Sequence, residues 1–274
     1  MMRVLLFIFV LTTHIYPTVP MNWDRLSVTF RKFDAMPLNE TAAECLGWLM
    51  FKNDCATNND NGFVGKRYAL SGDKATVLIY DMSGNIAGIQ MGHVADDKYL
   101  SKPRKHGGAM VKDNGYMYVT AYFIDPNRIC NKHLTRRPGN IGDRLLFLTG
   151  PQEYLTVPIE EENIKMTEWV VGQCFRGMGQ HYWYGIKKDM KCEDGFPAFV
   201  MYTNGLLHGF GFSTDWDMDS SRVEHPTAYV LNFFFRPETL PDCLKEATRT
   251  RTTQHVFFTK DASVTKPICP VTVP

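Results

Sequence analysis

Long apolar runs that are followed by turn residues dominate the hydrophobic pattern of this chain. Two of them, Ala75–Asp81 (ATVLIYD) and Phe196–Tyr202 (FPAFVMY), are rich in β-branched and aromatic residues, which is typical of strands. The turn sequences Ser83-Gly84-Asn85 and Thr203-Asn204-Gly205 come after them. Because Asn and Gly favour the tight turns of hairpins, each run is predicted to pair with the strand that follows it.

Two further runs are apolar at almost every position, Tyr116–Ile124 (YMYVTAYFI) and Thr227–Phe235 (TAYVLNFFF). Such runs indicate central strands that are covered on both faces. Pro126 and Pro237 come soon after them, and proline ends a strand because it lacks the N–H that a ladder needs. The run Arg144–Ile159 (RLLFLTGPQEYLTVPI) predicts a closing hairpin.

Helices are predicted ahead of the strands, over Leu38–Phe51 (LNETAAECLGWLMF) and Glu160–Val171 (EEENIKMTEWVV). The first has Asn39 or Thr41 as its N-cap, and the second begins with acidic residues that complement the helix dipole. The apolar positions of the first helix would be Leu46, Trp48, Leu49 and Met50. Shorter helices are expected at Cys130–Arg136 and Cys243–Arg249.

The pattern recurs along the chain. Residues 118–126 (YVTAYFIDP) resemble residues 229–237 (YVLNFFFRP), and further similar segments follow in the same order. We therefore predict a tandem duplication of a unit of about 115 residues, with repeats at 21–160 and 161–274. Each repeat is expected to be an antiparallel-rich sheet backed by helices, which is an α+β fold stabilised by disulfides.

The N-terminal residues 1–20 have the pattern of a secretory signal peptide. Arg3 precedes a short apolar run, Val4–Val10, and a polar, proline-containing stretch follows. No other run approaches the length of a membrane span, so we expect a secreted, extracellular protein without a transmembrane segment. The formal net charge of +1 provides no electrostatic argument for nucleic acid as a partner.

Seven cysteines in an exported chain predict disulfides. The proposed repeat matches Cys55 with Cys174 and Cys130 with Cys243. The predicted bridges are Cys55–Cys130, Cys174–Cys243 and Cys192–Cys269, with Cys45 either free or in an intermolecular disulfide. Asn39 begins an N-glycosylation sequon, Asn-Glu-Thr, which export would make usable.

Familiar catalytic and nucleotide-binding motifs are absent from the sequence, so the candidates are local clusters. Three consecutive aromatic residues after His181 could line a cleft for a small molecule or a carbohydrate. The residues assigned to this cleft are Tyr182, Trp183, Tyr184 and Phe210. The alternative is that these residues alternate between the core and the surface, with His181 facing solvent.

Histidines near acidic residues suggest a second kind of site. His181, His208 or His225 could act as an acid or base, with Asp215 or Asp217 orienting it. A surface role for these histidines is the competing interpretation.

Alternating acidic residues suggest a calcium loop, because calcium prefers hard oxygen ligands. The candidate ligands are Asp215, Asp217, Asp219 and Glu224. The sixth position lacks the glycine of an EF-hand, however, and Glu224 comes two residues early, which favours a solvated acidic loop.

Three functions remain open from the sequence. The first is a secreted, disulfide-stabilised protein that binds a ligand in an aromatic-lined cleft. The second is a secreted enzyme with a His/Asp acid–base site in the second repeat, and the third is an extracellular matrix or venom component. The sequence does not identify the ligand or any reaction.

Overall fold

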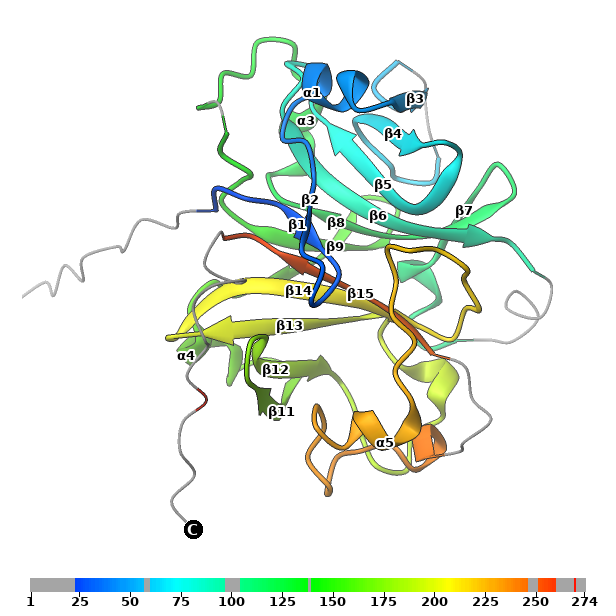
Figure 1. Ribbon diagram of the computed structural model, residues 1–274, viewed down its shortest axis with the longest axis vertical. Helices are drawn as coiled ribbons and strands as arrows, with labels where there is room; N and C mark the ends of the chain where they lie inside the picture. The colour runs from blue at the N-terminus through cyan, green and yellow to red at the C-terminus, as the bar shows by residue number, and fades with distance from the viewer. Residues whose placement is uncertain are drawn as a thin grey trace, which may run out of the picture.

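The computed structural model describes residues 23–56, 60–96, 104–137, 139–245, 251–259 and 269. The predicted signal peptide lies outside these residues. Two antiparallel sheets pack face to face, one above the other in Figure 1. In the described part of the chain, no helix is long and apolar enough to cross a membrane.

The first sheet has the strand order β10-β9-β8-β6-β5-β4-β3, and β7 pairs with β8 beside this path. Its strands are β3 (Trp48–Asn53), β4 (Lys66–Leu70), β5 (Asp73–Tyr80), β6 (Ile86–Val94), β7 (Val111–Asp113), β8 (Tyr116–Tyr122), β9 (Leu145–Gly150) and β10 (Glu153–Val157). The β5–β6 and β9–β10 hairpins confirm the strands and turns that the sequence predicts there.

The second sheet has the order β11-β12-β13-β14-β15-β1-β2. Its strands are β1 (Ser27–Val28), β2 (Asp34–Ala35), β11 (Trp169–Phe175), β12 (Gly179–Tyr184), β13 (Ala198–Thr203), β14 (Leu206–Thr214) and β15 (Thr252–Phe257). The predicted β13–β14 hairpin is confirmed, with Asn204 and Gly205 both at positive φ. The N-terminal hairpin β1–β2 completes this sheet by pairing with β15.

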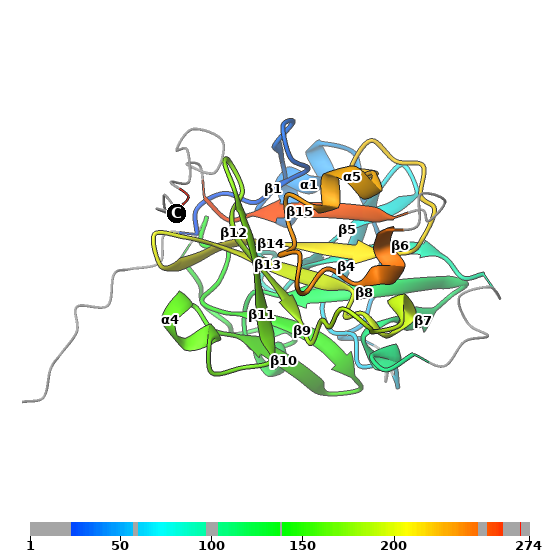
Figure 2. The ribbon, with the colours of Figure 1, turned by 90° about the horizontal axis from the view of Figure 1, so that it is seen from below.

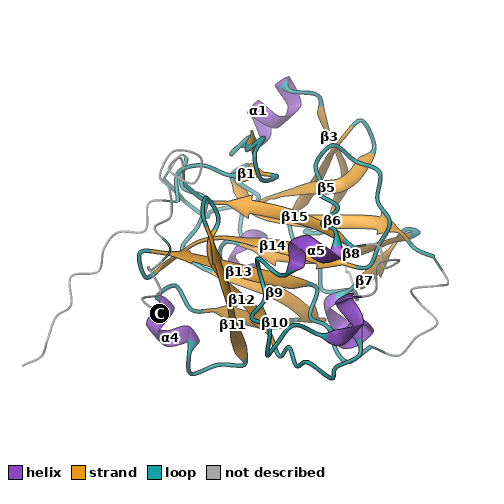
Figure 3. Cartoon of the chain, turned by 60° about the horizontal axis from the view of Figure 1, so that its bottom comes forward, coloured by secondary structure: helices purple, strands orange, loops and turns teal. Residues whose placement is uncertain are grey.

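The prediction of an α+β fold with helices backing the sheets is wrong, because strands dominate and the helices are short (Figure 3). The α-helices are α1 (Glu40–Cys45), α3 (Pro126–Ile129), α4 (Glu161–Ile164) and α5 (Ala228–Leu231). Single 3₁₀ turns lie at η1 (Gly107–Ala109), η2 (Cys192–Asp194) and η3 (Asp242–Lys245). The short helix expected at Cys130–Arg136 lies just before it, as α3, and residues 246–250 of the last one are outside the described residues.

The two longer predicted helices end early for a local reason. Asn39 caps α1 as predicted, its side chain accepting a hydrogen bond from the Ala42 N–H at 2.8 Å. Gly47 follows the helix at φ +83°, a conformation that ends helices, and the chain enters β3 at Trp48. In the same way α4 is one turn long, and Trp169 already belongs to β11.

The strand predicted over Thr227–Phe235 is also wrong, because residues 228–231 form α5. The buried side chains of this run, Leu231, Phe234 and Phe235, have helical spacing, and Tyr229 is 73 % exposed. A run that is apolar at nearly every position carries no periodicity to separate helix from strand.

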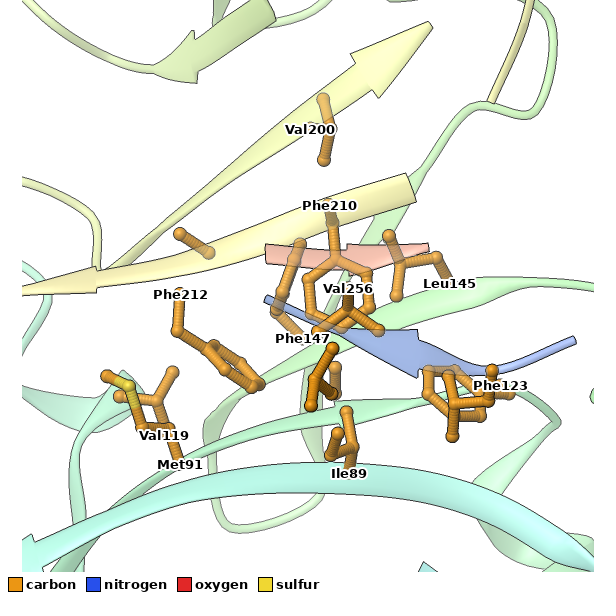
Figure 4. Close-up of a cluster of buried hydrophobic side chains, with 14 of the residues drawn as sticks. Ile89, Met91, Val119, Phe123, Leu145, Phe147, Val200, Phe210, Phe212 and Val256 are labelled. Carbon is orange, nitrogen blue, oxygen red and sulfur yellow. The ribbon is translucent and has the colours of Figure 1, made fainter. Parts of the chain in front are cut away.

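The main core lies between the two sheets (Figure 4). Side chains of the first sheet, such as Ile89 and Val119, face Phe210 and Val256 of the second. Phe147 makes edge contacts with Phe210 and Phe212, at ring-centroid distances of 5.5 and 6.5 Å. This interdigitation of two inner faces is that of a β-sandwich.

Each sheet also buries side chains on its outer face. On the first sheet, Val77 and Tyr122 pack beneath the segment that contains Ile129 of α3. On the second sheet, Phe199 and Phe257 pack beneath the segment that contains Leu231 of α5, which crosses the strands in Figure 2. The strands are therefore covered on both faces, as the long apolar runs predict.

Three disulfides stabilise the sandwich. They are Cys55–Cys130, Cys174–Cys269 and Cys192–Cys243, and Cys45 is free and exposed. The first bridge and the single Cys45 agree with the predictions, whereas the other two predicted pairings are wrong. Cys243 lies in η3, directly after the segment that contains α5, where it meets Cys192 of η2 and not Cys174 of β11.

Matching hydrogen bonds tie each sheet to the segment before it. In both halves, one tyrosine hydroxyl donates to a glutamate carboxylate and another to a proline carbonyl. The corresponding pairs are Tyr68–Glu40 with Tyr182–Glu161, and Tyr80–Pro37 with Tyr202–Pro158. These contacts are compatible with the predicted duplication, whose division at residues 160 and 161 stays a prediction.

Candidate functional site

A cavity of about 270 Å³ lies on the outer face of the second sheet. Strands β12 to β15 form its floor, and the segments around α5 and the β1–β2 hairpin cover it. Its apolar lining consists of Phe30, Phe175, Met178, Trp183, Phe199, Pro226, Val230, Leu231 and Phe234. Its polar lining consists of Arg31, His181, Ser213, Glu224, His225, Thr253 and His255.

The strand register builds the floor. Trp183, Phe199, Gly211 and His255 are direct neighbours across β12, β13, β14 and β15. A Cβ atom on Gly211 would lie 2.2 Å from the Phe199 ring, so the glycine lets this ring lie across β14. The Phe199 ring thereby comes within 5.0 Å of the His255 ring, measured between centroids.

His181 is the most deeply buried polar residue of the pocket, at 1 % exposure. Its ring lies between those of Phe199 and Phe234, at centroid distances of 5.5 and 5.1 Å. Burial, followed by the nearby His255, lowers the pKa of His181 to about 3, against a smaller raising effect of the Gly179 and Gln173 backbone. His181 is therefore neutral at physiological pH.

The two ring nitrogens of His181 differ. Nδ1 lies 3.1 Å from the Gly179 carbonyl oxygen, and Nε2 makes no hydrogen bond of ordinary distance and angle among the described residues. A carbonyl oxygen can only accept, so Nδ1 carries the proton and Nε2 has the free lone pair. A buried acceptor without a donor is unusual in a folded protein and points to a role.

Glu224 connects the polar side of the pocket to its cover. One carboxylate oxygen accepts a hydrogen bond from the Phe30 N–H at 2.7 Å. The other accepts from the Thr253 hydroxyl at 3.2 Å and lies 3.2 Å from Nδ1 of His255, outside hydrogen-bond alignment. Glu224 thus holds the β1–β2 hairpin over the His255 side of the cavity.

The β1–β2 hairpin reaches the pocket through a tight turn. Thr29, Arg31 and Phe33 all have positive φ, between 50° and 76°, which few non-glycine residues adopt. This turn directs the Phe30 ring toward Phe175 and His255, at centroid distances of 5.9 and 6.2 Å.

Trp183 is the one residue of the predicted aromatic cleft that lines the cavity. Tyr182 and Tyr184 flank it on β12, where successive side chains point to opposite faces. The Tyr182 hydroxyl instead donates to Glu161 at 2.9 Å. Phe210 lies in the core between the sheets and is fully buried, so no ligand reaches it.

Of the predicted acid–base residues, His181 and His225 line the cavity, whereas His208 and Asp215 do not. His208 is buried elsewhere, its Nε2 lying 2.7 Å from the Met178 carbonyl oxygen, and burial lowers its pKa to about 4. Asp215 does not line the cavity and pairs with Arg104, with an N–O distance of 3.1 Å. His225 does line the cavity, from an exposed position beside Glu224.

The predicted calcium site is not formed. Among the described residues, no three His, Cys, Asp or Glu side chains are arranged to hold a metal ion. Glu224 faces Phe30 and His255, while Asp217 and Asp219 are exposed. In the same run, Asp215 pairs with Arg104.

His255 and Phe30 are pocket residues that sequence reasoning missed. The alternation of Thr253, His255 and Phe257 along β15 places them on one face, but no strand is predicted for these residues from the sequence. For Phe30 no local signal exists, because its position depends on pairing between β1 and β15, which are more than 200 residues apart in the sequence.

Ser213, also in the pocket, is not arranged as a nucleophile. It is buried, and its hydroxyl oxygen accepts a hydrogen bond from Nε of Arg251 at 3.1 Å. A guanidinium cannot remove the hydroxyl proton, because it stays protonated at all relevant pH values.

Comparison with known proteins adds no assignment: no family model, curated protein or solved structure matches this chain.

Proposed function

We propose that this protein binds a small, mainly apolar ring compound in the pocket on the second sheet. The observation that carries the proposal is the cavity itself, about 270 Å³ in volume and lined by aromatic rings. An apolar cavity of about 150 Å³ holds one benzene molecule, so this one suits about two fused rings.

The pocket walls are held by their own contacts, which favours binding over collapse. The Trp183 ring stacks on Phe235 at 4.0 Å and contacts Phe199 at 4.8 Å. Glu224 fixes the hairpin that carries Phe30. A pocket that is already formed loses little conformational entropy when a ligand enters.

An extracellular setting agrees with this function. The three disulfides suit an oxidising compartment, and residues 1–20 have the pattern of a signal peptide. Asn39 is exposed, so its sequon is accessible for glycosylation. We propose that the protein is secreted and carries or senses its ligand outside the cell.

Saturation-transfer NMR with naphthalene and the full chain tests the proposal. We expect binding with a dissociation constant between about 10 µM and 1 mM, from apolar burial in a ligand of this size. Val230→Trp would fill the pocket and abolish the signal, because Val230 is part of its lining. Tyr229→Trp is the matched control, since Tyr229 is exposed and should leave binding unchanged.

Two results would overturn the proposal. One is the absence of naphthalene binding to the unmodified protein. The other is equal binding by the Val230→Trp variant, which would place the ligand elsewhere on the molecule.

A second candidate function is acid–base catalysis, favoured by the proximity of Glu224 to His255 in the same pocket. A carboxylate beside an imidazole can orient it as a general base. Hydrolysis of 2-naphthyl acetate tests this function. An enzyme predicts turnover that His255→Gln abolishes, whereas a binding protein predicts the same background rate for both proteins.

A further inference from the structure

Two buried nitrogen atoms of the pocket lining form no hydrogen bond among the described residues, Nε2 of His181 and Nδ1 of His255, and the first is the more deeply buried. His181 is 1 % exposed, and Nε2 makes no hydrogen bond within the described structure. Leaving a buried acceptor without a donor destabilises the folded protein. A molecule in the pocket that donates a hydrogen bond would remove this cost.

Two other polar groups of the pocket lining are already engaged with the protein. The Glu224 carboxylate accepts from Phe30 and Thr253, and the Ser213 oxygen accepts from Arg251. The rings of Phe199 and Phe234 flank His181. Nε2 of His181 therefore stays available as an acceptor, beside two aromatic rings.

We propose that the pocket selects aromatic ligands that carry a neutral hydrogen-bond donor, such as a phenol or an indole, and that this donor binds Nε2 of His181. The inference rests on the proposed binding function and adds the chemical class of the ligand.

Charged ligands fit this site less well. A carboxylate would place its own lone pairs against that of Nε2, and the carboxylate of Glu224 also lines the pocket, whereas the cationic Arg31 of the lining is exposed. An ammonium group would lose its hydration while Glu224 stays engaged by Phe30 and Thr253. A neutral O–H or N–H supplies the donor without either cost.

A series of four matched ligands tests the selection at pH 7, namely 2-naphthol, naphthalene, 2-methoxynaphthalene and 2-naphthoate. Their dissociation constants are measured on the full chain by competition NMR. We expect 2-naphthol to bind about tenfold more tightly than naphthalene or 2-methoxynaphthalene, and 2-naphthoate to bind more weakly than naphthalene.

Two variants locate the effect. In His181→Phe, the affinity ratio of 2-naphthol to naphthalene should fall to about one, while naphthalene binding stays within about threefold. The control is His208→Gln, at a buried histidine that does not line the pocket, and it should keep the ratio of the unmodified protein.

If His181→Phe does not fold, the ¹⁵N chemical shift of Nε2 in the unmodified protein gives the same information. It should move when 2-naphthol is added and stay constant with naphthalene.

The outcomes separate the two proposals. Equal affinities for 2-naphthol and naphthalene, or a preference that survives in His181→Phe, would overturn the selection while leaving the binding function intact. A constant Nε2 shift with bound 2-naphthol would do the same. If none of the four ligands binds, the binding function fails and the selection fails with it.

Discussion

The outer faces of the two sheets bury polar residues of different kinds, a charged arginine on the first and a neutral histidine on the second. On the first sheet, Arg67 of β4 is fully buried and its Nε donates to Asp54 at 2.6 Å. It also pairs with Asp113, and its guanidinium carbon lies 4.6 Å from the Phe63 ring centroid. On the second sheet, His181 lies on β12, which like β4 is the neighbour of an edge strand, and it forms no ion pair among the described residues.

This difference teaches how a pocket can form on one of two similar faces. A buried cation has to be paired, so two carboxylates and an aromatic ring pack against Arg67. A neutral imidazole can be buried without a charged partner. Around His181 a cavity of about 270 Å³ remains between strands β12 to β15 and the segments that cover them, around α5 and the β1–β2 hairpin.

The largest loss of stability is expected from a substitution on the outer face of the first sheet. Arg67→Ala should lower the free energy of unfolding by about 4 kcal/mol, because it removes the buried guanidinium that pairs with Asp54 and Asp113. His181→Phe should change it by less than about 1 kcal/mol, since no ion pair is lost. Urea unfolding followed by tryptophan fluorescence measures both. Arg144→Ala, at a half-exposed pair with Asp143, is the control and should change stability by less than about 0.5 kcal/mol. Equal losses for Arg67→Ala and His181→Phe would contradict the comparison.

Two disulfides provide a second test of the comparison, because one lies near the segment that covers each outer face. Removing Cys55–Cys130 or Cys192–Cys243 by paired Cys→Ala substitutions should each cost about 3 kcal/mol of stability. Naphthalene binding should persist without the first bridge and weaken without the second, which anchors the chain beside the pocket cover. NMR binding assays on the two variants measure this. Equal naphthalene binding by the two variants would contradict this comparison.

Low pH should lower the stability of the protein through the buried histidines of the second sheet. The pKa of His208 is lowered from 6.5 to about 4, so the unfolded state binds more protons and stability falls as pH drops below about 6.5. This group alone should cost about 2 kcal/mol between pH 7 and pH 5. His208→Gln should remove that part of the pH dependence in urea unfolding. An unchanged slope in this variant would refute the assignment.

The hairpins could be predicted from the sequence, because their signals are local. Asn204-Gly205 sets the β13–β14 turn, and the apolar strands around it alternate or run continuously. For Trp48 and Trp169 the sequence predicts helices instead of strands, because apolar residues that follow helix-start signals fit a helix, and the break at Gly47 is a weaker signal.

The candidate site could be predicted in part. His181 and Trp183 alternate on one strand, so both were found. His255 and Phe30 come from β15 and the β1–β2 hairpin, which reach the pocket through pairing between the two ends of the chain. Such long-range pairing has no signature in a single sequence, which is also why two of the three disulfides were paired incorrectly.

A crystal structure of the protein with 2-naphthol tests the central claim most directly. The naphthalene rings are expected in the cavity, beside the rings of Phe199 and Phe234, with the hydroxyl oxygen within about 3.2 Å of Nε2 of His181. Side chains that fill the cavity, or a ligand bound at another surface, would contradict it.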